Sequence, residues 1–331
     1  MFNKKPPFEI THTILKEMAS IAELVGKISV KENLHSSPVL RRRNRIRTIY
    51  SSLAIEQNTL SLDQVTAVLN GKHIIAPPRD ITEVKNAYEI YDIMDSLNPF
   101  SIDDFLKAHA IMTRGLIDES GYFRTKPVGV VNDKGNILHF GTLPDYIPGL
   151  IGDLFDWTKN SDLPMLLKSC VFHYELELIH PFADGNGRMG RLWHTLLLSQ
   201  WNPALAWLPV ESIIHDRQQE YYESINKSNI NGESSIFITF MLSAINDALT
   251  ETIQTEQLAN NMSTNEVRWQ QIYQFLQEHN VITNANVREL LQVSPATANR
   301  ILAGFTERGL IHKIRIGKQW AYRLNTNLEF S

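Results

Sequence analysis

The stretch HPFADGNGRMGR occupies residues 180–191 and is the most informative part of this sequence. Apolar residues recur at helical spacing before it, over residues 166–179, and again after it, over residues 192–198. A Gly-rich turn that opens a helix points several backbone N–H groups and the positive end of the helix dipole at one place. The stretch therefore predicts an anion-binding turn between two helices.

The charged side chains of this stretch are those that phosphate chemistry needs. Arg188 and Arg191 lie three residues apart on the first turn of the following helix, so they share a face and can bind two phosphates. Asp184 can hold Mg²⁺, which prefers one or two carboxylates together with phosphate oxygens. His180 stands at the entrance of the loop, where a neutral imidazole can take a proton from a hydroxyl group. Together they indicate phosphoryl or nucleotidyl transfer.

The same residues also have an ordinary structural interpretation. Gly-Asn-Gly at residues 185–187 is typical of a left-handed turn between helices, arginines pair with surface carboxylates, and a lone histidine is usually structural. Any two of these features would favour that interpretation. All of them, in this order within twelve residues, favour the chemical one.

The stretch resembles the signature of the Fic family, His-Pro-Phe-x-Asp-Gly-Asn-Gly-Arg-x-x-Arg, at every fixed position. Residues 106–124, 173–176 and 217–229 resemble the family's segment ahead of its flap, its lead-in helix and its adenine-side helix. The resemblance covers about residues 40–250. It implies a mainly α-helical, Fic-type core and a protein adenylyltransferase, which transfers AMP from ATP to a Ser, Thr or Tyr hydroxyl. The target would be another protein or the chain itself.

The resemblance also implies a role for each residue of the site. His180 would be the general base, and Asp184 would hold Mg²⁺ between the α- and β-phosphates of ATP. Backbone amides of residues 185–187 and the Asn186 side chain would stabilise developing charge, while Phe182 is expected to anchor the loop in the core. The residues implied to line the ATP site are Phe182, Ala183, Asp184, Gly185, Asn186, Gly187, Arg188 and Arg191 of the motif, Ile137, Leu138 and His139 of the flap, and Tyr221, Tyr222 and Asn229 of the later helix. The alternative for the two tyrosines is a place in the core of an amphipathic helix.

A second informative run is SSLAIEQN at residues 51–58. Ser52 and Glu56 lie four residues apart, so on a helix they stack on one face. This spacing alone is common in helices. The run resembles the family's inhibitory motif, Ser/Thr-x-x-x-Glu-Gly/Asn, except that Gln57 stands where Gly or Asn is usual. The resemblance implies that the Glu56 carboxylate pairs with Arg191 and occupies the position that the γ-phosphate needs.

Residues 128–140 break the helical pattern. Two β-rich runs, at 128–131 and 137–140, flank a turn cluster that contains Asp133 and Gly135, which predicts a β-hairpin. An isolated hairpin in a helical chain is marginal unless something binds it, so it is either a decorative ribbon or a binding element. The family resemblance favours a flap whose edge holds the target peptide by strand addition.

Composition places the chain among ordinary globular proteins. Its 331 residues allow two or three domains, and 43% of them are hydrophobic and 21% charged. A net charge of −4 gives no general attraction to nucleic acid or to an anionic membrane. Cys170 is the single cysteine, so no disulfide can form within the chain. Residues 1–10 lack an apolar signal region and we expect no run of 18 apolar residues, so we expect a cytoplasmic protein without membrane contact.

Helical periodicity dominates the chain, and its changes predict four parts. We expect an N-terminal helical region with the inhibitory helix over residues 1–99, a Fic catalytic core over 100–250, a polar linker over 251–265 and a winged-helix-like domain over 266–331. The helices expected in the first two parts cover residues 8–35, 39–52, 82–97, 101–116, 166–179, 188–200, 211–228 and 234–250.

The last part has the pattern of a winged helix. The expected elements are helices at 267–279, 286–291 and 295–309 and strands at 310–316 and 319–324. The third helix has Ser294 as its N-cap and Pro295 at its first position. Winged helices often place such a helix in the major groove of DNA, and the residues available for this are Thr297, Asn299 and Arg300 on the helix and Lys313, Arg315, Lys318 and Arg323 on the wing. DNA contact and protein docking both stay open.

Rival functions also stay open. Proteins of this fold use other nucleotides or phosphocholine donors, and some remove AMP, with the inhibitory Glu orienting a water molecule. A non-enzymatic alternative is a transcription regulator whose Fic core is a sensor, against which the complete motif argues. The resemblance further implies a homodimer, although no residue of the sequence proves a contact.

Overall fold

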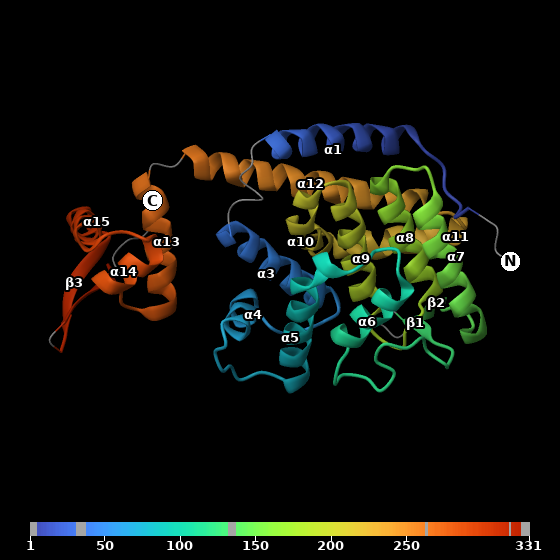
Figure 1. Ribbon diagram of the computed structural model, residues 1–331, viewed down its shortest axis with the longest axis horizontal. Coiled ribbons are helices and arrows are strands. Elements are labelled where there is room, and N and C mark those ends of the chain that lie inside the picture. The colour runs from blue at the N-terminus through green and yellow to red at the C-terminus, as the bar shows by residue number, and fades with distance from the viewer. Residues whose placement is uncertain (1–4, 31–37, 132–136, 262–263, 318, 326–331) are drawn as a thin grey trace. The chain divides into compact units, whose positions relative to one another are not determined.

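The computed structural model describes residues 5–30, 38–131, 137–261, 264–317 and 319–325. The chain divides into two compact units, Met1–Thr252 and Ile253–Ser331 (Figure 1). Each unit has a hydrophobic core of its own, so each is explained by its own packing.

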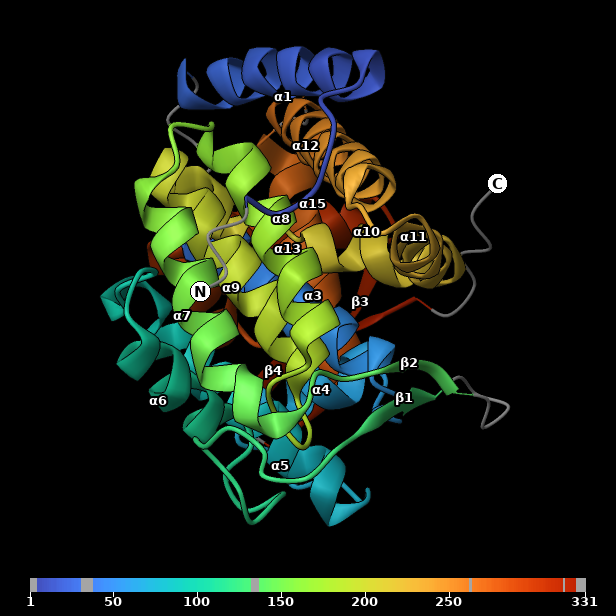
Figure 2. The same cartoon turned by 90° about the vertical axis from the view of Figure 1, so that its right-hand side faces the viewer.

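The first unit is built almost entirely from helices. They are α1 (His12–Val30), α3 (Pro38–Ile55), α4 (Leu62–Leu69), α5 (Pro78–Asp92), α6 (Ile102–Met112), α7 (Ile147–Asn160), α8 (Met165–Ile179), α9 (Asn186–Trp201), α10 (Val210–Asp216), α11 (Gln218–Asn231) and α12 (Ser235–Asn261). Short 3-10 helices cover Met94–Ser96, Pro144–Tyr146 and Pro203–Trp207. The strands β1 (Gly129–Val131) and β2 (Ile137–Phe140) pair as an antiparallel hairpin that projects from the helices (Figure 2).

Helices α8 and α9 pack against each other at the centre of this unit, because apolar side chains cover most of their surface. Fully buried members of the two helices include Cys170, Phe172, Leu176, Leu192, Trp193 and Leu197. Phe105 of α6 meets the rings of Phe172 and Trp193 edge-on. Trp193 Nε1 also donates a hydrogen bond to Pro99 O at 3.0 Å. These contacts fix the two helices between which the motif loop runs.

The N-terminal helices share this core. Ile49 and Leu53 of α3, with Val84 and Ile90 of α5, belong to the same buried cluster as the residues of α8 and α9. The helical region expected over residues 1–99 therefore belongs to one unit with the residues that follow it, because α3 and α5 bury apolar side chains in the same core cluster as α8 and α9.

Most helices lie where the sequence predicts them, with ends shifted by a few residues. The expected helix over 211–228 is two helices, α10 and α11, which meet at Arg217. Helices α4 and α7 were not predicted from the sequence. For α4 a signal existed, since Ser61 and Gln64 form a capping box: Gln64 N donates to Ser61 Oγ at 3.2 Å and Ser61 N donates to Gln64 Oε1 at 2.9 Å.

The expected linker over residues 251–265 is wrong in part, because α12 continues to Asn261 and α13 begins at Thr264. A polar segment suits an exposed helix as well as a linker. Ser235–Thr255 is a helix long and apolar enough to cross a membrane by length and composition, although Asn246, Asp247 and Glu251 interrupt its apolar residues, as the expectation of no run of 18 apolar residues requires. Core helices pass the same test, and this segment buries Phe237, Ile238, Met241, Leu242, Ile245 and Leu249 inside the first unit.

The second unit has three helices followed by a hairpin, the order that the sequence predicts. Its elements are α13 (Thr264–His279), α14 (Asn284–Leu291), α15 (Pro295–Glu307), β3 (Ile311–Ile316) and β4 (Gln319–Leu324). The strands are antiparallel, and an isolated bridge joins Ile282 to Tyr322 of β4. Its buried core consists of Ile272, Leu276, Ile282, Val287, Ala298, Ile301, Leu302, Phe305 and Ile311.

The hairpin of this unit exposes cationic and aromatic side chains. Trp320 is 54% exposed, and Lys313 Nζ lies 4.3 Å from the centre of its ring. Arg315 lies over the same ring at 5.6 Å. Asn299 of α15 accepts a hydrogen bond from Asn284, and Lys318 lies outside the described residues. DNA or protein contact by this surface stays a prediction.

Candidate active site

The motif forms the loop between α8 and α9. Helix α8 ends at His180, whose backbone is left-handed with φ 53° and ψ 60°. A left-handed residue other than glycine is costly, so surrounding contacts must hold His180 in this conformation. Arg124 supplies them, since its Nε donates to His180 O at 2.7 Å and its backbone N donates to Pro181 O at 3.0 Å.

Phe182 and Asn186 brace the loop. The Phe182 ring is fully buried, and Phe182 N donates to Asn186 Oδ1 while Asn186 Nδ2 donates to Phe182 O, both at 2.9 Å. The side chain of Asn186 therefore braces the turn, and its expected role of stabilising charge on a substrate stays a prediction. Phe182 likewise anchors the loop and does not present its ring to a ligand.

His109 of α6 is a residue of this site that the sequence analysis did not single out. Its ring stacks on Phe182 with the two centres 3.6 Å apart. Gly121 N donates to His109 Nδ1, and His109 Nε2 donates to Asp184 O, each at 3.0 Å. Burial lowers the pKa of His109 to about 4, so the ring is neutral and holds the Asp184 backbone in place. Its only signal in the sequence was its place within residues 106–124.

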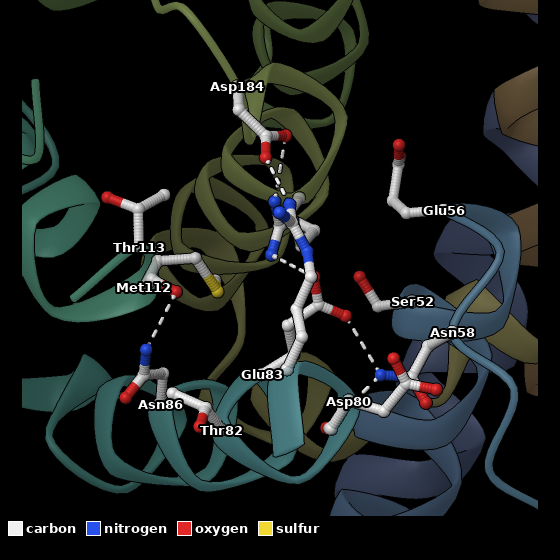
Figure 3. A network of polar contacts seen from close by, with 12 residues as sticks. Ser52, Glu56, Asn58, Asp80, Thr82, Glu83, Asn86, Met112, Thr113 and Asp184 are labelled. Carbon is white, nitrogen blue, oxygen red and sulfur yellow. Dashed lines mark hydrogen bonds and ion pairs between the residues drawn. The ribbon is translucent and has the colours of Figure 1, made fainter. Parts of the chain in front are cut away.

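Asp184 is an ionised carboxylate at the mouth of the loop. Arg188 Nη2 donates to its Oδ1 at 3.0 Å, and Arg79 Nη2 of α5 donates to its Oδ2 at 2.9 Å (Figure 3). Burial would raise the pKa of Asp184, but the charges of Arg188 and Arg79 and the Gly185 N–H hold it below its usual value. The side chain is 36% exposed, so a solvated cation can reach it. One ionised, accessible carboxylate fits Mg²⁺, which takes its other oxygen ligands from phosphate and water.

Arg188 is buried, but some of its N–H donors have no hydrogen-bond acceptor among the described residues. Its side chain is 3% exposed, and its Nη1 lies 3.6 Å from Glu83 Oε1. The Nε and Nη1 groups have no hydrogen-bond acceptor among the residues that the structure describes. Buried guanidinium donors without an acceptor are costly, so they favour an anionic ligand such as a phosphate.

Arg191 is fully engaged by the end of α3. Its Nε donates to Ser52 Oγ at 3.0 Å, and its Nη2 donates to Ser52 O at 2.9 Å and to Glu56 Oε1 at 2.7 Å. Arg191 is 1% exposed, and although burial would lower its pKa, the charge of Glu56 raises it further above its usual value. The helical stacking of Ser52 and Glu56 that the sequence predicts thus brings both residues to Arg191.

The Glu56 carboxylate lies directly over the Gly-rich turn. A Cβ added at Gly187 would collide with Glu56 Oε1 and would come within 3.1 Å of Arg191 Nη1. Gly187 is therefore needed at this position so that a carboxylate can approach the start of α9 closely. An anion already stands where the backbone N–H groups and the helix dipole favour one.

His180 lies beside a buried carboxyl group. Its Nδ1 is 4.0 Å from Glu177 Oε2, and the imidazole is 20% exposed. Burial, and next the negative charge of Glu56, raise the pKa of Glu177 to about 7. The other Glu177 oxygen lies 3.8 Å from His173 Nε2, so this carboxyl group lies between His173 of α8 and His180 of the motif loop.

The residues expected on the adenine side separate into buried and exposed ones. Tyr221 is 1% exposed and its hydroxyl lies 3.2 Å from His173 Nε2, so it is a core residue and its assignment to the ATP site is corrected. Tyr222 is 39% exposed, and its hydroxyl donates to Ile55 O at 3.3 Å. Asn229 accepts a hydrogen bond from the Tyr174 hydroxyl at 2.8 Å. Of the two tyrosines, Tyr222 alone has surface to offer a ligand.

The flap is described only in its backbone. Ile137, Leu138 and His139 form part of β2, and their side chains lie outside the described residues. Their expected place beside a nucleotide stays a prediction. Ala183 is exposed at the outer edge of the motif loop.

The chain is similar to known proteins both in the region of its motif and along nearly its whole length. A sequence profile described as Fic/DOC family matches residues 99–198. The crystal structure of a Fic family protein from Desulfovibrio desulfuricans G20 shares 38% sequence identity and a TM-score of 0.75, and the match covers 99% of this chain and 100% of that one.

Two relatives are named as adenylyltransferases. The protein adenylyltransferase fic-1 of Caenorhabditis briggsae is 30% identical over 225 residues, which are 63% of this chain and 42% of that protein. A probable protein adenylyltransferase of Aquifex aeolicus is 27% identical over 150 residues, 43% of each chain. The chain thus spans less than half the length of these relatives. From the motif geometry and the full-length match to the Desulfovibrio protein, the chain belongs to the Fic/DOC family.

Proposed function

We propose that this protein is an adenylyltransferase that transfers AMP from ATP to a Ser, Thr or Tyr hydroxyl of a protein, and that Glu56 inhibits it. The observation that carries the proposal is an anion site built from the start of α9, Arg188 and Arg191, next to a histidine and an ionised carboxylate. The Glu56 carboxylate, which accepts a hydrogen bond from Arg191 in this site, supports a negatively charged ligand. The names of the relatives support an adenylyl group as the group that is transferred.

In the proposed reaction His180 accepts the proton of the target hydroxyl. The hydroxyl oxygen then bonds to the α-phosphorus of ATP, the bond to the bridging oxygen breaks, and pyrophosphate leaves. Arg188 and Arg191 neutralise the departing phosphates, and the backbone N–H groups at the start of α9 bind an oxygen on which charge develops. Asp184 would hold Mg²⁺, which supplies further charge neutralisation at the phosphates.

Inhibition follows from competition for one guanidinium group. Glu56 Oε1 accepts a hydrogen bond from Arg191 Nη2 at 2.7 Å and fills the space over Gly187. A phosphate that needs the same donors must bind elsewhere, so ATP would bind with its α-phosphate out of line for attack. The resting protein is therefore expected to transfer AMP slowly.

The test is the Glu56→Gly variant, incubated with ATP labelled in the α-phosphate and with cell lysate as a source of targets. Removing a charge-assisted bond to a buried arginine should raise labelling of protein about 10- to 100-fold. Mass spectrometry of the labelled residues identifies the group transferred, and GTP, CDP-choline and a target already carrying AMP are run in parallel.

Two control variants make this result specific. Gln57→Gly introduces the same residue one position later and keeps the carboxylate, so its labelling should match the wild type. His180→Ala added to Glu56→Gly should remove the label. Labelling that is unchanged or lower in Glu56→Gly contradicts inhibition, and the absence of adenylyl transfer in every variant contradicts the proposed activity.

A further inference from the structure

Helix α5 reaches into the anion site from outside the residues that the family profile matches. Its first two turns carry Arg79 and Glu83, whereas the profile begins at residue 99. Arg79 and Glu83 also pair with each other, with Nε and Oε1 3.4 Å apart. We call these two residues the α5 clamp. Figure 3 shows Glu83 on α5 between Asp184 of the motif loop and Asn58.

Arg79 engages the carboxylate that a metal ion would need. Its Nη2 lies 2.9 Å from Asp184 Oδ2, while Asp184 Oδ1 accepts from Arg188. Both oxygens of the one carboxylate thus have a guanidinium partner. A divalent cation that binds Asp184 must share these oxygens with two guanidinium groups or displace one of them, and Arg79, at 57% exposure against 3% for Arg188, is the more easily displaced.

Glu83 engages the second phosphate-binding arginine. Its side chain is 10% exposed and its Oε1 lies 3.6 Å from Arg188 Nη1. Each arginine of the motif therefore faces one carboxylate from the helices that precede it, Arg191 facing Glu56 and Arg188 facing Glu83. A negative charge at this distance from Arg188 opposes the approach of a triphosphate.

The α5 clamp is also hydrogen-bonded to the residues that follow Glu56. Asn58, two residues after Glu56, donates from Nδ2 to Glu83 Oε2 at 2.8 Å and to Asp80 O at 3.2 Å. Thr59 N donates to Asp80 Oδ2 at 3.0 Å. The start of α5 is therefore bonded on one side to the turn that carries Glu56 and on the other to the motif loop.

We propose that Arg79 and Glu83 are positioning residues that form a second restraint on the nucleotide site, separate from Glu56. Arg79 competes with a divalent cation for Asp184, and Glu83 competes with phosphate for Arg188. The restraint rests on the proposed function, since it concerns the same site. Removing Glu56 alone leaves the clamp closed, so the Glu56→Gly variant should still demand more divalent cation than an unclamped site.

The test measures nucleotide binding, not turnover. Binding of α,β-methylene-ATP to the full-length Glu56→Gly protein is followed by calorimetry at increasing Mn²⁺, and bound Mn²⁺ is followed by electron paramagnetic resonance. Adding Arg79→Gln should lower the Mn²⁺ concentration for half-maximal binding about two- to fivefold, the range for loss of an exposed ion pair. Arg79→Lys keeps the charge and should give a smaller shift.

Matched controls come from an ion pair that Glu89 of the same helix forms with Arg114, which follows α6. Arg114 pairs with Glu89 near the other end of α5 and is 59% exposed, close to the 57% of Arg79. Arg114→Gln should leave the Mn²⁺ dependence unchanged. Glu83→Gln retains an acceptor for Asn58 and should tighten analogue binding at saturating Mn²⁺, whereas Glu89→Gln should not.

Each outcome of these measurements supports or overturns the clamp or the proposed activity. Where the Glu56→Gly protein binds the analogue, an Mn²⁺ dependence that Arg79→Gln leaves unchanged or shifts to higher concentration overturns the restraint, whether or not the protein transfers AMP in the separate labelling assay. If Glu56→Gly binds the analogue but transfers no AMP, the proposed activity fails while the clamp is judged by the shift alone. If it neither binds nor transfers, both proposals are overturned.

Discussion

At the scale of single residues, Arg191 is held by Ser52 and by Glu56 at the same time. Two of its bonds go to Ser52, through Oγ and the backbone oxygen, and one goes to Glu56. Ser52 therefore fixes the guanidinium whether or not Glu56 is present. Loss of the carboxylate frees a donor on an arginine that α3 still holds in position, which is what a preorganised phosphate site requires.

Gln57 is the residue at which this chain departs from the inhibitory motif, and its backbone explains why the family favours Gly or Asn there. Its φ is 66°, in the left-handed region. Gln57→Gly should raise the free energy of unfolding by about 1 kcal/mol because glycine adopts this conformation without steric cost. Urea unfolding checks this, with Gln219→Gly inside α11 as a control that should lose about 1 kcal/mol. A Gln57→Gly protein less stable than the wild type contradicts the expectation.

At the scale of elements, the motif loop depends on side chains from α6 as much as on its own sequence. His109 supports it twice, through the stacked Phe182 ring and through the hydrogen bond to Asp184 O. Neither contact was predictable from spacing, because His109 and Asp184 are 75 residues apart in the sequence and meet only through packing. The bonds of Asn186 to Phe182 were not predictable either, since a side-chain amide in a Gly-rich turn can hydrogen-bond the turn or a ligand equally well.

The neutral state of His109 predicts how acid affects this element. Burial lowers its pKa from 6.5 to about 4, so the unfolded chain binds the proton more readily and stability falls as pH drops from about 6.5 to about 4. His109→Gln should lower stability at pH 8, but it should also reduce the loss between pH 6.5 and 4.5 by about 2 kcal/mol. Denaturant unfolding at several pH values checks this, with the half-exposed His215→Gln as control. An identical pH dependence in His109→Gln and the wild type would contradict it.

At the scale of the whole molecule, the sequence predicts elements better than their assembly. Most of the helices, both hairpins and the pairing of Glu56 with Arg191 follow from periodicity, turn residues and the resemblance. The α5 clamp does not, because Arg79 and Glu83 form an unremarkable helical pair until tertiary packing brings Asp184 and Arg188 to them. The place of Tyr221 in the core was not predictable either, since an aromatic residue in a helical pattern does not show whether its side chain faces the core or a ligand.

The division into two units predicts which truncations the chain tolerates. Helix α12 crosses the boundary at residue 252, and its apolar residues up to Leu249 are buried in the first unit, whereas the second unit has a separate core. A Glu56→Gly chain ending at Asn261 should fold and retain AMP transfer within about twofold of full length, because no buried contact of the first unit is lost. A chain ending at Met241 loses Ile245 and Leu249 from the core and should melt at least about 10 °C lower. Circular dichroism and the labelling assay on both chains check this. Inactivity of the folded 1–261 chain would mean that the second unit takes part in the reaction.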